Sequence, residues 1–432
     1  MMLYYSTNHK SPKADFKQAT IQGLASDKGL YFPESIPQLK KDFVHNLNQY
    51  SKEEIAFTVI EPFVGNTIPN NDLKRIISET INFDFPLIEI EKDISSLELF
   101  HGPTLAFKDV GARFMSRCLA YFVKGQNQKI TVLVATSGDT GGAVANGFFN
   151  VEGIEIVILY PSGKVSNIQE LQLTTLGKNI SALEIDGTFD DCQEMVKQAF
   201  ADKELGEKIT LTSANSINIA RWLPQQFYYF FACRQWKDKK APVISVPSGN
   251  FGNLSAGLLA YMSGLPIAHF IAACNANDVV PAYLSSGNYL PKKSVATISN
   301  AMDVGDPSNF VRIKELFKEE PNLLTTMLSA FSISDEETIS GIRNVFQHAK
   351  YLLDPHGGVG YLALKKYLKH NPHSKGIFLE TAHPVKFYDV IEPIVGQPVE
   401  MPAELKGLLK SKKQSQTMGK EFTQLKDYLL SR

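Results

Sequence analysis

The sequence predicts an α/β protein in which open parallel sheets are covered by helices on both faces. From about residue 93 onward, short and nearly uninterrupted apolar runs alternate with stretches of helical spacing. This alternation is typical of parallel βαβ units whose strands are buried on both faces. Residues 1–92 instead mix short helical and turn signals and predict a small mixed N-terminal domain. We expect the α/β region to span 93–400 and a basic, polar helical tail to span 401–432.

Six apolar runs are the predicted strands. In chain order they are ITVLVAT (130–136), IEIVILY (154–160), ISALEI (180–185), PVISVP (242–247), IAHFIAACN (267–275) and GIFLET (376–381). Stretches with helical features follow the first four runs, at 138–150, 163–177, 190–202 and 249–264. Ligands of open α/β sheets bind at the carboxyl ends of the strands, so the turns that follow these runs are the first candidates for a site.

The charge balance excludes partners that need a strongly charged protein. Lys and Arg number 44 against 45 Asp and Glu, which gives a net charge of -1. We therefore expect no nucleic-acid or membrane partner. No apolar stretch reaches about 18 residues and the N-terminus has no signal-peptide pattern, so a cytoplasmic protein is expected. Four widely spaced cysteines are interpreted as reduced, and no metal site is expected; the cysteines are Cys118, Cys192, Cys233 and Cys274.

Two strand-to-helix turns are unusually small and polar. They are TSGDTGG (136–142) and PSGNFGN (247–253). Glycine lets the backbone approach a ligand closely, while Ser, Thr and Asn add hydrogen-bond donors. Neither turn matches the nucleotide-binding P-loop or the dinucleotide fingerprint. The pair favours a phosphorylated ligand, although such residues also occur in tight turns that bind nothing.

Lys108 occupies an unusual place at the start of a predicted helix. Apolar residues recur at helical spacing from Phe107 onward, and Thr104 is the predicted N-cap. The helix dipole and burial behind Phe107 should both lower the pKa of Lys108. An amine that is partly neutral can attack an aldehyde and form an imine. The alternative is an ordinary lysine paired with Asp109 or with a distant carboxylate.

Several longer strings together resemble the threonine synthase family. They are AFKD around Lys108, SGDTG and SGNFGN in the two turns, ETAHP near residue 381, and YYSTNH and GLASDKGLYFP near the N-terminus. The resemblance therefore extends over nearly the whole chain. It implies a pyridoxal 5′-phosphate (PLP) enzyme of fold type II, the fold of the tryptophan synthase β subunit.

The resemblance also implies which residues bind the cofactor. Lys108 would carry PLP as an imine and serve as the catalytic base. The turn after the fourth predicted strand would hold the cofactor phosphate through Gly249, Asn250, Phe251, Gly252 and Asn253. Thr381 matches the residue that hydrogen-bonds the pyridine nitrogen, and a hydroxyl there would leave that nitrogen largely unprotonated. Asp139 stands near the 3-hydroxyl, where related enzymes often carry asparagine.

By the same similarity, the segment SANSINIAR (213–221) would hold the phosphate of the substrate. The residues concerned are Asn215, Ser216 and Arg221, joined by Thr140 from the first turn. The implied reaction converts O-phospho-L-homoserine and water to L-threonine and phosphate by β,γ-elimination and replacement, the last step of threonine biosynthesis. The enzyme would act as a monomer or homodimer.

Two other functions stay open at this stage. A serine/threonine dehydratase of the same fold would share the lysine and the glycine-rich turn, but its substrate carries no phosphate. A non-catalytic protein that binds phosphorylated metabolites would use the two turns without an imine. His101 could contact substrate or could simply belong to a loop. We interpret the glycines in 354–368 as helix-start packing near the site.

Overall fold

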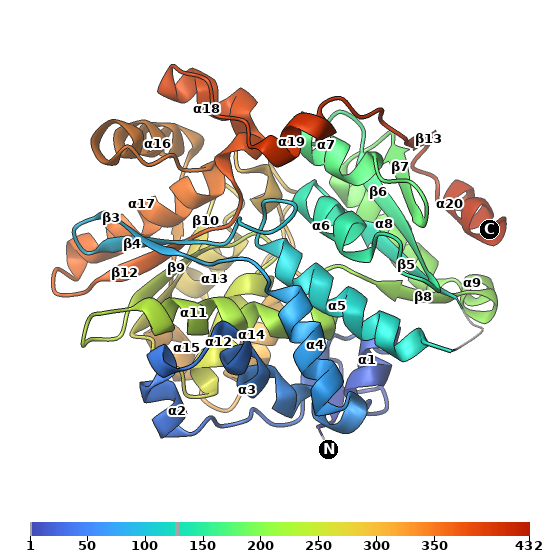
Figure 1. Ribbon diagram of the computed structural model, residues 1–432, viewed down its shortest axis with the longest axis horizontal. Coiled ribbons are helices and arrows are strands. Elements are labelled where there is room, and N and C mark those ends of the chain that lie inside the picture. Colours follow the sequence, from blue (N-terminus) through green and yellow to red (C-terminus); the bar gives the residue numbers. More distant parts are fainter. Residues whose placement is uncertain (1, 126–128) are drawn as a thin grey trace.

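The computed structural model describes residues 2–125 and 129–432. Two sheets lie side by side, and helices cover both (Figure 1). The six-stranded sheet has the order β11-β10-β9-β12-β4-β3 and is parallel except where β3 pairs with β4. Its strands are β3 Leu87–Glu91, β4 Ile94–Glu98, β9 Val243–Pro247, β10 His269–Cys274, β11 Leu328–Ser332 and β12 Gly376–Glu380.

The five-stranded sheet has the order β13-β7-β6-β5-β8 and is parallel throughout. Its strands are β5 Ile130–Ala135, β6 Ile154–Pro161, β7 Ile180–Ile185, β8 Thr210–Ser213 and β13 Gln416–Met418. Every residue of β5 is buried, as expected for a central strand with helices on both faces.

The N-terminal part contains a two-stranded antiparallel sheet and four α-helices. These elements are β1 Tyr4–Ser6, β2 Tyr31–Pro33, α1 Phe16–Gln22, α2 Lys41–His45, α3 Lys52–Val64 and α4 Asn70–Thr80. They share one hydrophobic core with later elements, since Phe16 and Ile60 belong to the same cluster as Phe114 and Trp222. The domain limits at 92 and 400 stay a prediction; β3, which begins at Leu87, already belongs to the six-stranded sheet.

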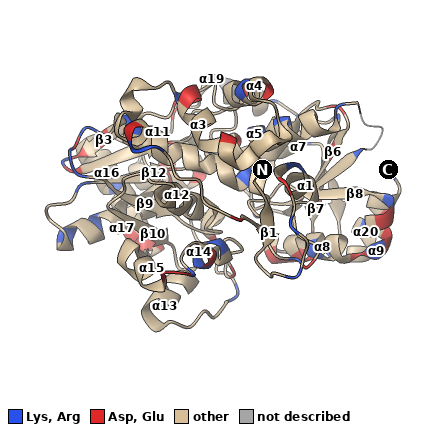
Figure 2. Ribbon diagram, turned by 90° about the horizontal axis from the view of Figure 1, so that it is seen from below, with Lys and Arg blue, Asp and Glu red and all other residues tan. Residues whose placement is uncertain are grey.

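The remaining helices cover the two sheets and link their strands. They are α5 Lys108–Val123, α6 Asp139–Phe148, α7 Asn167–Thr174, α8 Phe189–Ala201, α9 Lys203–Lys208, α10 Ile219–Trp222, α11 Phe227–Gln235, α12 Gly252–Met262, α13 Val279–Ser286, α14 Phe310–Leu316, α15 Pro321–Met327, α16 Asp335–Ala349, α17 Pro355–His370, α18 Tyr388–Val395, α19 Ala403–Leu408 and α20 Phe422–Leu430. Basic and acidic residues are spread over many of these elements (Figure 2).

The predicted α/β architecture is confirmed, and all six predicted strands occur within two residues of their expected limits. The tail differs in one respect from the expected loose lead-in, because residues 416–418 form β13 and pair with β7 before α20 begins. A short polar edge strand of this kind gains its hydrogen bonds from a distant partner and carries little local signal.

The cysteines agree with the expectation of reduced residues. All four are free, and Cys118, Cys192 and Cys274 are buried. Across residues 2–125 and 129–432 there is neither a helix able to span a membrane nor a cluster of side chains suited to a metal ion.

Candidate active site

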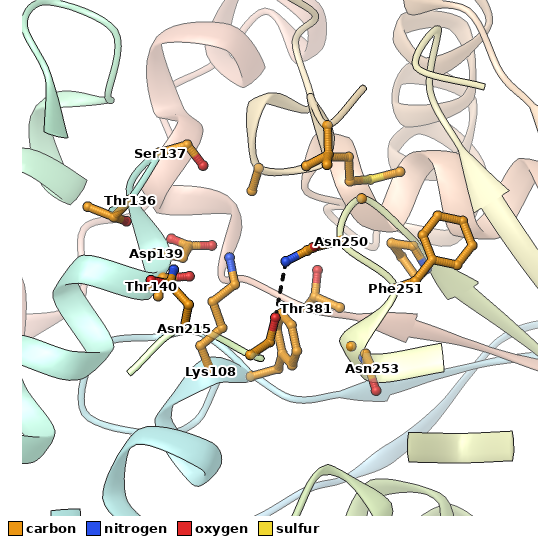
Figure 3. A pocket seen from close by; sticks show the side chains of 18 of the residues that line it. Lys108, Thr136, Ser137, Asp139, Thr140, Asn215, Asn250, Phe251, Asn253 and Thr381 are labelled. Atoms are coloured by element: carbon orange, nitrogen blue, oxygen red, sulfur yellow. Dashed lines mark hydrogen bonds between the residues drawn. The ribbon is translucent and has the colours of Figure 1, made fainter. Parts of the chain in front are cut away.

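A pocket opens between the two sheets, at the carboxyl ends of their strands (Figure 3). The turns after β5 and β9 and the residue after β12 all contribute to its wall. The empty space amounts to about 950 Å³, its open mouth included. Twelve predicted site residues line it: Lys108, Asp139, Thr140, Asn215, Ser216, Arg221, Gly249, Asn250, Phe251, Gly252, Asn253 and Thr381.

Lys108 is the first residue of α5, and Phe107 is the N-cap. The predicted N-cap role of Thr104 is wrong. The Thr104 hydroxyl and backbone N–H instead donate to the two carboxylate oxygens of Asp109, at 2.6 and 2.9 Å. Asp109 therefore holds the loop before the helix. The alternative ion pair between Asp109 and Lys108 does not occur among the described residues.

The Lys108 amine reaches the pocket without a hydrogen-bond partner among the described residues. It lies 5.6 Å from the ring centroid of Phe107. Burial lowers its pKa to about 8; Asp139 opposes this shift, whereas the charges of Lys386 and Arg221 favour it. The predicted direction is confirmed, with desolvation as the main cause. The lowered pKa makes the neutral amine more accessible near neutral pH than in an exposed lysine.

Asp139, the first residue of α6, is buried. Its Oδ1 lies 2.6 Å from Nζ of Lys386 and accepts a 2.9 Å hydrogen bond from Nε2 of Gln169. Burial alone would raise the pKa of Asp139, but the charges of Lys386 and Lys108 outweigh it and hold the pKa well below its usual range. No sequence motif singled out Lys386 or Gln169, because their importance arises only from packing.

The glycine-rich turn after β9 presents free backbone donors. The N–H groups of residues 249–253 donate to no described residue, although they lie at the start of α12. Phe251 adopts a left-handed conformation with φ 61°, and a Cβ on Gly249 would lie 2.6 Å from Cα of Met302. Asn253 adds a buried Nδ2 without a partner among the described residues. Such an arrangement suits an anion at a helix N-terminus.

Thr381 follows β12 directly and faces the same space. Its side-chain hydroxyl has no partner among the described residues, so it is free to contact a ligand. Figure 3 shows Thr381 and Asn250 on the side of the pocket opposite Asp139, with the Lys108 amine between the two sides.

The expected phosphate-binding residues of the substrate lie together. Arg221 is 2% exposed and donates to the carbonyl of Ala214, and burial lowers its pKa to about 10, so it is charged at neutral pH. Ser216 Oγ accepts hydrogen bonds from Nδ2 of Asn250 at 3.2 Å and of Asn309 at 2.9 Å. With two bonds accepted, its own O–H is left to donate.

Two histidines differ in their relation to the pocket. His101 is exposed and outside the lining, with its Nε2 2.7 Å from Oε2 of Glu98. His356, at the start of α17, does line the pocket. Its Nδ1 pairs with Asp354, and its Nε2 accepts from the N–H of Ala301 at 3.2 Å. In the segment 354–368, it is therefore this histidine, rather than the glycines, that reaches the site.

The residues present fit PLP. An amine of lowered pKa can bind the aldehyde, and the glycine-rich turn with Asn253 offers unused donors for its phosphate. Further along the wall, Arg221 and Ser216 offer a cation and a hydroxyl donor for a second anion. Sequence reasoning missed other lining residues, which have no recognisable motif: Phe189, Gln193, Gln225, Ala301, Met302 and Val304.

Three family models match the chain. The model of pyridoxal-phosphate dependent enzymes matches residues 95–379, that of the threonine synthase N terminus matches 3–81, and that of the threonine synthase C-terminal region matches 358–429.

Individual proteins agree with these matches along the full length. A threonine synthase of Haemophilus influenzae is 47% identical over 431 residues, covering 99% of this chain and 100% of that protein. The crystal structure of threonine synthase from Escherichia coli superposes with a TM-score of 0.94 at 41% identity, covering 100% of both chains. A PLP-bound threonine synthase from Brucella melitensis gives a TM-score of 0.91 at 35% identity, covering 99% of both chains.

Proposed function

The chain belongs to the threonine synthase family of PLP-dependent enzymes, and from this premise we propose that its pocket converts O-phospho-L-homoserine and water to L-threonine and phosphate. One observation carries the proposal: the Lys108 amine, of lowered pKa, lies in a pocket with two adjoining groups of anion-binding donors. The first group is the turn 249–253, and the second includes Ser216 and Arg221. A phosphorylated substrate and a phosphorylated cofactor together require both.

The cofactor would occupy one end of the pocket. Lys108 would bind the aldehyde carbon, and the turn 249–253 would hold the cofactor phosphate through its free N–H groups. The Thr381 hydroxyl would donate to the pyridine nitrogen, and because a hydroxyl is neutral it would leave that nitrogen largely unprotonated. The Asp139 carboxylate would face the 3-hydroxyl. When bound, PLP accepts electrons from the substrate carbons and so makes their protons acidic.

The substrate end follows from the second group of donors. Arg221 and Ser216, with Asn215 and Thr140, bind the substrate phosphate and orient the Cγ–O bond that breaks. Lys108, free to act as a base, would remove protons at Cα and Cβ, so that phosphate can leave from Cγ. Protons would then be returned to Cγ, which becomes the methyl group, and to Cα after water has added to Cβ, and the remaining proton would leave with the phosphate. A pKa of about 8 suits an amine that must both accept and donate protons near neutral pH.

The experiment that tests this proposal measures phosphate release from O-phospho-L-homoserine by the purified enzyme, together with threonine formation. L-Serine and L-threonine serve as control substrates, and 2-oxo acid formation is followed. We expect equal amounts of phosphate and threonine and little 2-oxo acid. Efficient 2-oxo acid formation without phosphate release would favour a dehydratase instead. A missing absorbance band at roughly 410–430 nm in cofactor-supplemented protein would contradict both PLP functions. A cytoplasmic location and a monomeric or homodimeric state stay predictions.

A further inference from the structure

Lys386 is a fully buried lysine that lies behind the pocket wall instead of in it. It belongs to the 3₁₀ helix Pro384–Phe387, five residues after Thr381, and its side chain is 0% exposed. Its Nζ lies 2.6 Å from Oδ1 of Asp139 and donates a 2.9 Å hydrogen bond to the carbonyl oxygen of Thr104. Burying an ammonium group is costly unless the group is paired. The ion pair with Asp139 offsets this cost, and the burial of both charges beside the pocket calls for an explanation.

Asp139 connects this lysine to the catalytic amine. Its Oδ1 is used by Lys386 and Gln169, whereas its Oδ2 accepts no hydrogen bond from a described residue. Asp139 also lines the pocket, and Figure 3 shows its carboxylate beside the Lys108 amine. The carboxylate thus stands between two lysines, one hidden in the wall and one open to the ligand.

The charges around the Lys386–Asp139 ion pair also act on the Lys108 amine. The Lys108 amine is influenced by the carboxylate of Asp139 and by the cations of Lys386 and Arg221. Asp109 on α5, bound to Thr104, also faces Lys386, as does His383 at the start of the same 3₁₀ helix. Without Lys386, the buried carboxylate of Asp139 would attract the Lys108 cation with little compensation.

We propose that Lys386 is a positioning residue that, by neutralising Asp139 inside the wall, limits how firmly this carboxylate holds a positive charge on Lys108. It leaves Lys108 able to release its proton near neutral pH while the open Asp139 oxygen stays available to the cofactor. The inference rests on the proposed role of Lys108 as the cofactor lysine. It assigns Lys386 no contact with substrate or cofactor.

The test compares variants in which one charge at a time is removed. Asp139→Asn keeps the shape and the accepting oxygen but removes the attraction, so the Lys108 proton should leave at lower pH. Lys386→Gln removes the neutralising charge, so that proton should leave at higher pH. We expect shifts of about one pH unit in opposite directions, which correspond to about tenfold changes in amine reactivity at a fixed pH below the midpoint.

The readout is independent of turnover. The full-length chain freed of cofactor is acylated over a range of pH, and the modification of Lys108 is measured by mass spectrometry. The absorbance titration of the cofactor-loaded enzyme gives a second midpoint, which should move in the same directions. Lys129→Gln, which removes an exposed lysine paired with Glu155 at the start of β5, is the matched control and should change neither midpoint.

A double variant keeps the test possible if Lys386→Gln does not fold. If Lys386→Gln alone leaves the buried Asp139 unpaired and does not fold, Asp139→Asn/Lys386→Gln is compared with Asp139→Asn. The two midpoints should then agree, because no carboxylate is left for Lys386 to neutralise, and a large rise in the double variant would overturn the inference. Unchanged midpoints in the folded single variants, or shifts of the same sign, would overturn it as well. The outcome is separate from that of the proposed function, because acylation of the cofactor-free chain requires neither PLP nor substrate.

Discussion

The backbone N–H of Phe107 donates a 2.9 Å hydrogen bond to the carbonyl oxygen of Thr381. Next to it, Ala106 and Ala382 form an isolated antiparallel bridge, and the N–H of His383 donates to the carbonyl of Leu105 at 3.0 Å. Main-chain bonds therefore fix the start of α5 against the end of β12. The positions of the Lys108 amine and the Thr381 hydroxyl depend on this rigid junction.

Lys108→Ala should abolish threonine formation, with a loss of at least about a thousandfold, because the variant lacks both the cofactor linkage and the base. The absorbance band of the lysine-bound cofactor should disappear as well. Thermal unfolding and phosphate release are measured in parallel, with Lys129→Ala as the exposed control. A folded Lys108→Ala enzyme that still released phosphate at a substantial rate would show that another group is the base.

Thr381→Val should lower kcat by about tenfold to a hundredfold while the lysine-bound cofactor band persists. The substitution keeps the shape of the side chain but removes its hydroxyl, which costs about 1–3 kcal/mol where the partner is left unsatisfied. Thr381→Ser should restore most of the activity. If the valine variant kept full activity, the hydroxyl would have no role at the pyridine nitrogen.

Arg221→Ala should raise KM for the phosphorylated substrate by at least about tenfold, because a charge-assisted bond contributes about 1.5–3 kcal/mol. Arg221→Lys keeps the charge without the planar fork and should be intermediate. Steady-state kinetics give KM and kcat separately, and Arg75→Ala on the exposed face of α4 is the control. An unchanged KM would remove Arg221 from the phosphate site.

Lys108 should also make the stability of the cofactor-free chain depend on pH. Its pKa is about 8 in the folded chain and about 10.4 when unfolded. Between these values the unfolded chain binds more protons, so the free energy of unfolding rises with pH through this group. The free energy of unfolding, measured with denaturant, should therefore be higher for wild type than for Lys108→Met by an amount that grows from pH 8 to pH 10. The opposite trend would mean that the folded pKa is not lowered.

Gly357→Ala should destabilise the protein by at least about 2 kcal/mol. A Cβ there would lie 1.5 Å from Oε2 of Glu380, whose other oxygen accepts a 2.6 Å bond from the N–H of Asp354. The carboxyl group cannot move away without losing this bond. Gly206→Ala on the exposed face of α9, where a Cβ meets nothing within 4 Å, should be neutral or slightly stabilising. Equal unfolding free energies for the two variants would contradict the close contact.

The strands that the sequence predicted are those whose signal is local. The run 130–135 is apolar at nearly every position, so the sequence alone predicts that it is buried on both faces. The strand Thr210–Ser213 is short and polar, and the hairpin from Leu87 to Glu98 mixes polar and apolar residues at a sheet edge. Neighbouring strands supply the hydrogen bonds of these strands, and no local pattern reports such a neighbour.

The candidate site likewise contains residues that a local motif predicts and residues whose role depends on distant parts of the chain. Residues inside recognisable strings, such as Lys108 and Thr381, could be expected to meet. Lys386 could not, since its importance arises where its 3₁₀ helix packs against α6, a contact between distant parts of the chain. Nearness in sequence also misleads: His101 lies close to Lys108 in the chain yet pairs with Glu98 outside the pocket, whereas the distant His356 lines it.

The central position of β12 has a consequence for biosynthesis. This strand, Gly376–Glu380, pairs with β9 on one side and β4 on the other, although both precede it in the chain. During translation, the edges of β4 and β9 therefore stay unpaired until β12, near the end of the chain, has been synthesised. Unpaired edges are prone to aggregation. The nascent chain should thus depend on protection by chaperones until residue 380 has emerged, and truncations before β12 should be insoluble, because they lack the strand that closes the sheet.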